Sequence, residues 1–290
     1  MGLTKDIAEP MEHVKYTPNT AKTTNTVNEL KSVPKQVLFR KCEKYGVSGT
    51  IQDIFKQNDI KRVSCPCSDK KCSHSCEKKW DVYLPCGYNN IEKELGRIKV
   101  HNNKQIIFGI SGCDKIVSKN YLWKLILLKY GRKKASQLMP DTYLIYEPSD
   151  MKLFQRNYTS QKVYILKKNV QRQTGLKITN NLREILELKK TSDFKLVQEL
   201  LMDPFLLNKR KINLRIYLLI ICHGKKRYAF IHKRGFMYYT PKFFVKNSLE
   251  REINITSGYV PRQVYEENPL TLLDFKKWLQ ENNYNAKKII

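Results

Sequence analysis

The sequence has no long apolar run. No stretch approaches the ~18 apolar residues that a membrane-spanning helix requires. Its start, MGLTKDIAEPMEH, lacks the apolar segment of a secretory signal. It also shows no internal repeat, which argues against a repeat architecture. We therefore expect no membrane insertion and a cytoplasmic location.

Acidic residues are scarce relative to basic ones. The chain has 27 Asp and Glu against 54 Lys and Arg, a formal net charge of +27. The excess is spread along the sequence, so the folded surface should be positive and a partner should be acidic. Nucleic acid, an anionic membrane surface, nucleotide phosphates and an acidic polypeptide would all suit such a surface. The chain lacks stacking motifs of the RNA-recognition kind, but a basic nucleic-acid-binding protein remains an alternative.

Cysteines are too few for a disulfide scaffold, since there are eight in 290 residues. Four of them nevertheless lie within CPCSDKKCSHSC, namely Cys65, Cys67, Cys72 and Cys76. Zn²⁺ is held by four thiolate or imidazole ligands, so this density suggests a zinc site. The spacing C-x-C-x₄-C-x₃-C differs from the usual paired C-x₂-C knuckles, which favours ordinary surface thiols. Both interpretations remain open.

The composition changes along the chain and suggests three parts. Residues 1–33 are rich in Thr, Asn and Lys and poor in large apolar groups, which predicts a flexible arm. Residues 34–110 are expected to form a small module that carries the cysteine cluster. Residues 111–290 form a larger region, and the apolar share of 41% is sufficient for a real core.

Helix signals recur at intervals. GTIQDIFKQNDI has the spacing of a short amphipathic helix, and the apolar stripe of SKNYLWKLILLKYG predicts a helix that ends near Gly131. A further helix is expected at about 181–188. PLTLLDFKKWLQENN predicts a closing amphipathic helix with Thr271 or a neighbour at its N-cap.

Strand signals dominate the second half. DTYLIYEPSD predicts a strand closed by Pro148, and further strands are expected in KVYILKK, INLRIYLLIICHG and KRYAFIHKRGFMYY, with a hairpin turn at Gly224. Together the segments indicate an α+β (α/β) fold.

The stretch YILKKNVQRQTGLKI, at 164–178, combines a strand with basic and flexible residues. Lys167 and Lys168 stand at the strand's end, before a loop that contains Gly175. An ammonium group suits phosphate as a mobile point charge, and glycine lets backbone approach a ligand closely. A phosphate-binding loop and an ordinary basic hairpin are the two interpretations that the residues alone allow.

Several motifs in one order resolve this choice. KKWDVYLPCGYNNIEKEL is followed by SKNYLWKLILLKYGRKKASQLMPDTYLI, YILKK…GLKI, LVQELLMDPFLLNKRKINLRIYLLI and HKRGFMYY. In this order they resemble the tubulin tyrosine ligase-like family over roughly residues 80–280. The resemblance implies an ATP-grasp fold, of which 111–290 would be the central and part of the C-terminal region.

The resemblance also implies nucleotide-binding residues. Lys167 would reach the phosphates of ATP, with the loop residues Arg172 and Gly175 beside it, although Gln173 replaces one of the family's glycines. Lys119 would be a second phosphate-facing lysine. Gln198 would lie at the hinge where the adenine binds.

Three further positions fall in KRKINLR. By the resemblance, Lys211 would contact the nucleotide, Asn213 takes the place of a ribose-binding aspartate, and Arg215 would be the catalytic arginine that holds an acyl phosphate. Two positions depart from the family: Tyr238 stands for an arginine and Ser257 for an asparagine.

The implied activity joins an amino acid to a protein carboxylate at the expense of ATP. The amino acid could be glutamate, as in polyglutamylation, or glycine or tyrosine, and the acidic protein would be tubulin through its C-terminal tails. Mg²⁺ is expected as a cofactor, yet its carboxylates should follow the point where this sequence ends. The alternatives are therefore a ligase whose last part is supplied separately and a noncatalytic module that binds nucleotide or tubulin.

Overall fold

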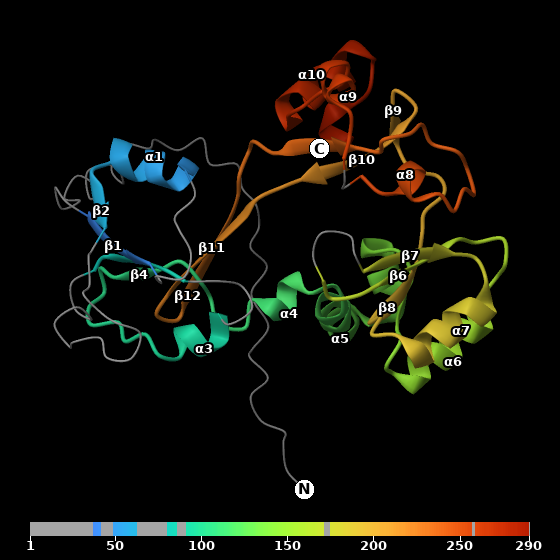
Figure 1. Cartoon of the computed structure of the whole chain (residues 1–290), viewed down its shortest axis with the longest axis horizontal. Coiled ribbons are helices and arrows are strands. Elements are labelled where there is room, and N and C mark those ends of the chain that lie inside the picture. The colour runs from blue at the N-terminus through green and yellow to red at the C-terminus, as the bar shows by residue number, and fades with distance from the viewer. Residues whose placement is uncertain are drawn as a thin grey trace, which may run out of the picture. The chain divides into compact units, whose positions relative to one another are not determined.

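The computed structural model describes residues 37–41, 49–62, 80–85, 91–170, 175–256 and 259–289. The chain divides into two compact units, one ending at Gly109 and one beginning at Ile110. Figure 1 labels their elements along the chain. The arm expected at 1–33 lies outside the described residues. None of the helices in the described ranges is long and apolar enough to cross a membrane.

The first unit contains a parallel four-stranded sheet in the order β2-β1-β3-β4. Its elements are β1 (Val37–Lys41), α1 (Gly49–Gln57), β2 (Ile60–Arg62), β3 (Val82–Leu84), α3 (Ile91–Leu95) and β4 (Ile106–Ile107). Trp80 and Tyr83 are buried and meet edge to face, with their ring centroids 5.8 Å apart. The buried amide of Gln105 donates to the carbonyl of Trp80 over 2.8 Å, which ties the start of β4 to β3. The helix predicted in GTIQDIFKQNDI is confirmed as α1.

The second unit begins with helices and an antiparallel sheet in the order β5-β8-β6-β7. Its elements are α4 (Asp114–Val117), α5 (Lys119–Leu138), β5 (Thr142–Leu144), α6 (Pro148–Asn157), β6 (Tyr164–Lys167), β7 (Leu176–Thr179), α7 (Leu182–Thr191) and β8 (Leu196–Glu199). Figure 1 shows α5 on one side of this sheet and α6 and α7 on the other.

Both faces of this sheet are covered, and the alternation of side chains decides what covers them. On one face, Tyr164, Leu166 and Val197 pack with the residues Met151 and Phe154 of α6 and with α7. On the other face, Leu144 and Leu196 pack against Trp123 and Ala135 of α5. The second face also carries polar side chains at one end, where the candidate site lies.

A second sheet has the order β13-β10-β9. It comprises β9 (Leu206–Leu207), β10 (Arg210–Arg215) and β13 (Phe236–Tyr239), followed by α8 (Arg251–Asn254), α9 (Arg262–Glu266), α10 (Leu272–Glu281) and α11 (Ala286–Ile289). Met237, Tyr239, Phe275 and Leu279 form the centre of its core, and Figure 1 shows α9 and α10 together over the strands. Thr271 and Asp274 form the capping box of α10, as predicted for Thr271.

The two remaining strands form a separate hairpin. β11 (Leu218–His223) pairs only with β12 (Lys226–Ile231) among the described residues. Gly224 has a φ of 56°, a left-handed conformation that glycine adopts without steric cost, so the predicted hairpin turn is confirmed. The hairpin continues directly from β10 and returns into β13.

Three predicted elements differ in detail. α5 does not end at Gly131: this residue is non-helical, with a φ of 70°, and a second helical segment follows the kink. Pro148 begins α6 as well as closing the segment after β5, because proline fits the first helical turn. The strand expected in INLRIYLLIICHG is interrupted at Ile216 and Tyr217, which separate β10 from β11.

Gly235 immediately precedes β13 and lies close to the end of β10. A Cβ there would lie 2.2 Å from the carbonyl oxygen of Arg215 and 2.8 Å from Cδ1 of Leu272. Gly235→Ala should therefore displace the end of β10 and the start of α10. We expect it to lower the free energy of unfolding by about 3 kcal/mol, measured by urea denaturation. As a control, a Cβ at Gly49 would meet nothing within 4 Å. Equal stability of the Gly235→Ala variant and the unmodified protein would contradict the expectation.

Candidate functional site

The polar end of the first sheet is organised around Lys167, the last residue of β6. Its ammonium donates to Oε1 of Gln198 over 2.5 Å, and the Gln198 amide donates in turn to Oγ1 of Thr142 over 2.6 Å. The Thr142 hydroxyl donates to the carbonyl of Pro140 over 2.7 Å. Thr142 and Gln198 are both buried. This chain of bonds fixes the Gln198 oxygen toward Lys167, so β5 and β8 position the ammonium at the end of β6.

Lys119 approaches the same place from α5. Its ammonium donates to the carbonyls of Lys168 and Val170, at 3.3 and 3.4 Å. The neighbouring Asn120 is buried and accepts a bond of 2.6 Å from Asn169. The start of α5 is thereby fastened to the segment that follows β6. In the described part of the chain, no carboxylate forms an ion pair with Lys119 or Lys167.

The surroundings of both ammonium groups disfavour their charged forms. Burial, and secondarily the charge of Lys119, lowers the pKa of Lys167 to about 8. Burial also lowers the pKa of Lys119. A buried cation beside a like charge is costly, and a bound anion would restore its protonated form. The geometry therefore suits an anionic ligand such as phosphate.

Lys211, on β10, is a third cation near this place, and unlike the half-buried Lys167 it is buried. It is 6% exposed, and it donates to the carbonyl of Leu201 over 3.2 Å and to Oδ1 of Asn254 over 2.8 Å. Its ammonium also lies 4.8 Å from the ring centroid of Phe244. Burial lowers the pKa of Lys211 to about 8. Lys167 and Lys211 thus both bond to the segment Gln198–Leu201, which leads from one sheet to the other.

Asn213 and Arg215 follow Lys211 at every second position of β10, so the three share one face of the strand. Ile212 and Leu214, on the opposite face, pack against the core. Asn213 and Arg215 are exposed. The Arg215 guanidinium lies 5.2 Å from the ring centroid of Tyr238. Here an aromatic face supports Arg215 where a second cation would repel it.

The loop glycine has a structural role that the sequence did not indicate. Gly175 accepts a backbone bond of 2.8 Å from Lys168, which closes the base of the loop. A Cβ on Gly175 would lie 2.5 Å from Cγ2 of Val170 and 2.6 Å from Cβ of Lys168. Glycine is therefore required for the loop's own packing as well as being suitable for approach to a ligand. Arg172 and Gln173 lie outside the described residues.

The metal sites expected from the sequence find no support in the described residues. Cys65, Cys67, Cys72 and Cys76 lie outside them, as does Ser257. The described ranges contain no group of three or more His, Cys, Asp or Glu that could hold a metal ion.

The carboxylates that follow Lys211 in the sequence form hydrogen bonds and ion pairs with other side chains or cap a helix. Glu250 and Glu252 pair with Lys242, Glu266 with Arg262 and Glu281 with Lys277, Glu267 accepts from Gln263, and Asp274 caps α10. These residues do not fit a Mg²⁺ site, which needs carboxylates that converge on one ion.

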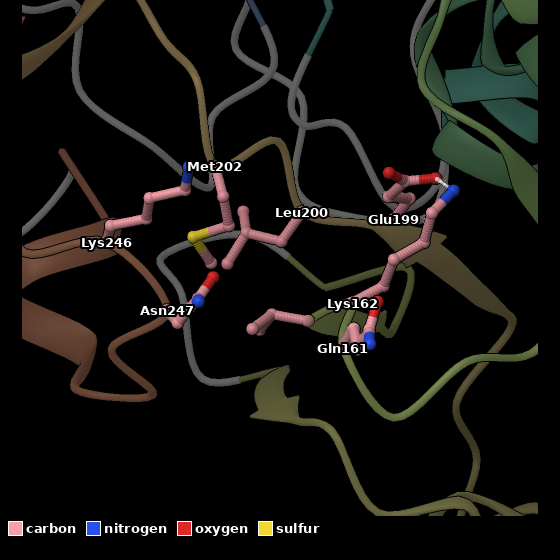
Figure 2. Close-up of a pocket in the computed structure, with 8 residues that line it drawn as sticks. Gln161, Lys162, Glu199, Leu200, Met202, Lys246 and Asn247 are labelled. Atoms are coloured by element: carbon pink, nitrogen blue, oxygen red, sulfur yellow. Dashed lines mark hydrogen bonds and ion pairs between the residues drawn. The ribbon is translucent and has the colours of Figure 1, made fainter.

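A pocket of about 450 Å³ lies beside the same connecting segment (Figure 2). Its lining comprises Gln161, Lys162, Val163, Glu199, Leu200, Met202, Lys246 and Asn247. Figure 2 shows the ion pair of Lys162 and Glu199, 2.7 Å long, at one side and Lys246 and Asn247 at the other. The pocket adjoins the start of β6, whereas Lys167 is the last residue of that strand. It is therefore a separate feature from the cluster of lysines.

The structure thus brings Lys119, Lys167 and Gln198 together and joins Lys211 to the same connecting segment. Asn213 and Arg215 extend from Lys211 along β10. Sequence reasoning missed Thr142 and Asn254, which orient Gln198 and hold Lys211. Neither lies in a recognisable motif, so no local signal could have identified them.

Comparison with protein families extends these observations. Residues 98–282, more than half of the chain, match the tubulin-tyrosine ligase family. A comparison with curated proteins found no match. The family indicates an ATP-dependent amino-acid ligase, and the matched region contains the three lysines, Gln198 and Arg215. The resemblance inferred from the order of motifs is confirmed, and the chain belongs to the tubulin-tyrosine ligase family.

Proposed function

We propose that the protein is an ATP-dependent carboxylate–amine ligase that adds an amino acid to an acidic protein, with the C-terminal tails of tubulin as the first candidate substrate. The observation that carries the proposal is the convergence of Lys167 and Lys211 on the segment Gln198–Leu201. Lys211 is buried and Lys167 half-buried, and each has a pKa of about 8, in a chain of this family. Such groups gain most when an anion is bound.

The proposed reaction has two steps. An oxygen of the substrate carboxylate attacks the γ-phosphorus of ATP, the bond to the β-phosphate oxygen breaks, and ADP leaves. The amine of the added amino acid then attacks the acyl carbon, an amide bond forms, a proton leaves the nitrogen, and inorganic phosphate departs. Negative charge builds on the transferred phosphoryl oxygens, so fixed positive groups stabilise the transition state.

The described residues can be given parts in this reaction. Lys167 and Lys119 bind the phosphates. Gln198 keeps the Lys167 ammonium in place, and the strand of Gln198, β8, lies near the adenine. Lys211 contacts the nucleotide from β10. In this proposal the two sheets are the two halves of an ATP-grasp fold, closed over the nucleotide.

Two exposed residues complete the proposed site. Asn213 lies near the ribose, and Arg215, supported by Tyr238, holds the acyl phosphate. Arg172 would approach the phosphates from the loop.

The positive surface suits an acidic protein substrate. With 54 basic against 27 acidic residues, the chain attracts a polyanionic tail and speeds encounter with it. A substrate of this kind implies a cytoplasmic location. Glutamate, glycine and tyrosine remain the candidate amino acids.

A second function, a noncatalytic module that binds nucleotide or acidic protein, is favoured by one observation. Among the described residues, the carboxylates beyond Lys211 are engaged in ion pairs, a helix cap or a side-chain hydrogen bond, and none converge on a metal site. Nucleic-acid binding is supported by the positive charge alone.

The proposal is tested by incubating the protein with ATP, Mg²⁺, tubulin and isotope-labelled glutamate, glycine or tyrosine. Mass spectrometry should detect one of the three on the tubulin tails, together with ADP. Lys167→Met serves as the inactive control. ATP binding without any added mass would instead support the noncatalytic module. Salt-sensitive binding of generic DNA or RNA without ATP binding would support the nucleic-acid alternative.

A further inference from the structure

The hairpin of β11 and β12 is unusually exposed. Every residue of the two strands is exposed except Ile220, which is half-buried. In the described part of the chain, no third strand pairs with either edge. A two-stranded hairpin alone is marginally stable in water, so a third strand would stabilise it considerably.

Its apolar side chains lie on both faces. Leu218 and Ile231 are cross-strand partners on one face, 57% and 70% exposed. On the other face, Leu219 and Phe230 are partners that are 50% and 52% exposed. A strand pair that faces water normally has one polar face, whereas apolar residues on both faces are typical of strands inside a larger, covered sheet. The hairpin therefore has the composition of an interior part of a sheet.

The backbone of β12 offers a free edge. The amide of His232 donates to the carbonyl of Tyr217 over 2.9 Å, which fixes the phase of the ladder. Because hydrogen-bonded pairs alternate in an antiparallel ladder, the amides of Tyr228 and Phe230 point toward β11. Those of Arg227, Ala229 and Ile231 point outward. An unpaired edge of this kind is a template for an added strand.

The hairpin is flanked by positive charges, which favour an acidic partner. Lys225, Lys226 and Arg227 lie at the turn, Lys233 and Arg234 lie at the other end, and residues 216–235 contain no Asp or Glu. None of the five cations forms an ion pair within the described residues. A second copy of this chain would bring the same positive charges together, so pairing between copies is unfavourable.

We infer that β12 is a docking edge for an extended, acidic segment of another polypeptide, which adds to the hairpin as a third strand. Backbone hydrogen bonds hold the segment, its alternate apolar side chains pack beside those of β12 on one face, and its carboxylates meet the cations at either end. β12 is the receiving strand because all of its residues are exposed, whereas β11 contains the half-buried Ile220. The inference does not depend on ligase activity, since the hairpin needs no nucleotide.

The test uses capped synthetic peptides and the full chain without nucleotide, with binding followed by fluorescence anisotropy. A peptide that alternates Glu with Val should bind, and one that alternates Lys with Val should not. A peptide of Glu alone should bind about tenfold more weakly, because it cannot cover apolar surface. Equal binding of the all-Glu peptide, or no binding of the Glu-Val peptide, would overturn the inference.

Two proline variants at directly opposed positions locate the edge. Ala229→Pro removes an outward amide of β12 and leaves the bonds to β11 intact, so it should weaken binding of the Glu-Val peptide at least about tenfold. Ile220→Pro removes the matching outward amide of β11 and should bind like the unmodified chain. Slow amide exchange at Tyr228 and Phe230 verifies that each hairpin is intact. Unchanged binding by the Ala229→Pro variant, or equal weakening in both variants, contradicts docking at β12.

Discussion

Lys167→Met is expected to weaken ATP binding by about a hundredfold, measured by isothermal titration calorimetry. The reason is that the ammonium of Lys167 is held by Gln198, has no carboxylate partner among the described residues, and gains its counter-ion only when a phosphate binds. Methionine keeps the length of the side chain and removes its charge. The variant should fold normally, because it removes a cation that burial disfavours.

The adjacent lysine provides a matched control. Lys168 already forms an ion pair with Asp193, and its ammonium lies 5.3 Å from the ring centroid of Phe194. Its charge therefore already has a counter-ion within the protein. Lys168→Met should change ATP affinity less than about twofold. If both variants lose affinity equally, the effect arises from net charge, and the site is not centred on Lys167.

The pH dependence of ATP binding follows from the same group. The pKa of Lys167 is about 8 in the free protein, and a bound phosphate should raise it. Affinity should therefore be constant below about pH 7 and fall as the pH rises through 8 and 9, since the free lysine must then take up a proton to bind. Calorimetry in buffers of different ionisation enthalpy would detect this proton uptake. A flat profile in the unmodified chain would show that neither Lys167 nor Lys211 faces the nucleotide.

Local patterns in the sequence were sufficient to predict the elements that carry the site. The end of β6 at Lys167 follows from an apolar run that meets two lysines and a polar loop, and the capping box at Thr271 follows from spacing alone. The same holds for the Gly224 turn. Each is determined by residues close together in sequence, which is the range over which propensity and periodicity act.

Contacts between distant segments could not be predicted in this way. Thr142 and Gln198 are 56 positions apart, and Lys211 and Asn254 are 43 apart, so their pairing depends on the completed sheets. The requirement for glycine at 175 is local, but it comes from the folded position of Val170 across the loop and not from a sequence pattern. The order of motifs indicated candidate lysines through the resemblance to the family, and the structure shows which groups hold them.

Asn254→Leu is expected to lower the free energy of unfolding by about 4 kcal/mol at pH 7, measured by urea denaturation. Asn254 is 7% exposed, accepts from the buried ammonium of Lys211, and donates to the carbonyls of Ser248 and Glu250 over 2.8 and 2.9 Å. Leucine would fill the space but leave a buried charge with the carbonyl of Leu201 as its remaining acceptor. ATP affinity should fall as well, because Lys211 loses its position.

The loss in the Asn254→Leu variant should depend on pH. Burial lowers the pKa of Lys211 in the folded protein to about 8, below its usual 10.5, so the folded state binds fewer protons than the unfolded state between these values. Stability of the unmodified chain therefore rises with pH across this window, and the full cost of the buried charge is present below pH 8. As Lys211 becomes neutral, the difference between the variant and the unmodified chain should shrink toward the cost of the lost amide bonds.

Asn268 supplies the comparison that separates charge from hydrogen bonding. It is 8% exposed, donates to the carbonyl of Val264 over 2.7 Å and accepts from Asn208 over 2.8 Å, with no charged partner in either bond. Asn268→Leu should therefore destabilise the chain by a similar hydrogen-bonding cost at every pH between 7 and 10. If the two variants lose stability in parallel across that range, the Lys211 ammonium is not the group that Asn254 stabilises.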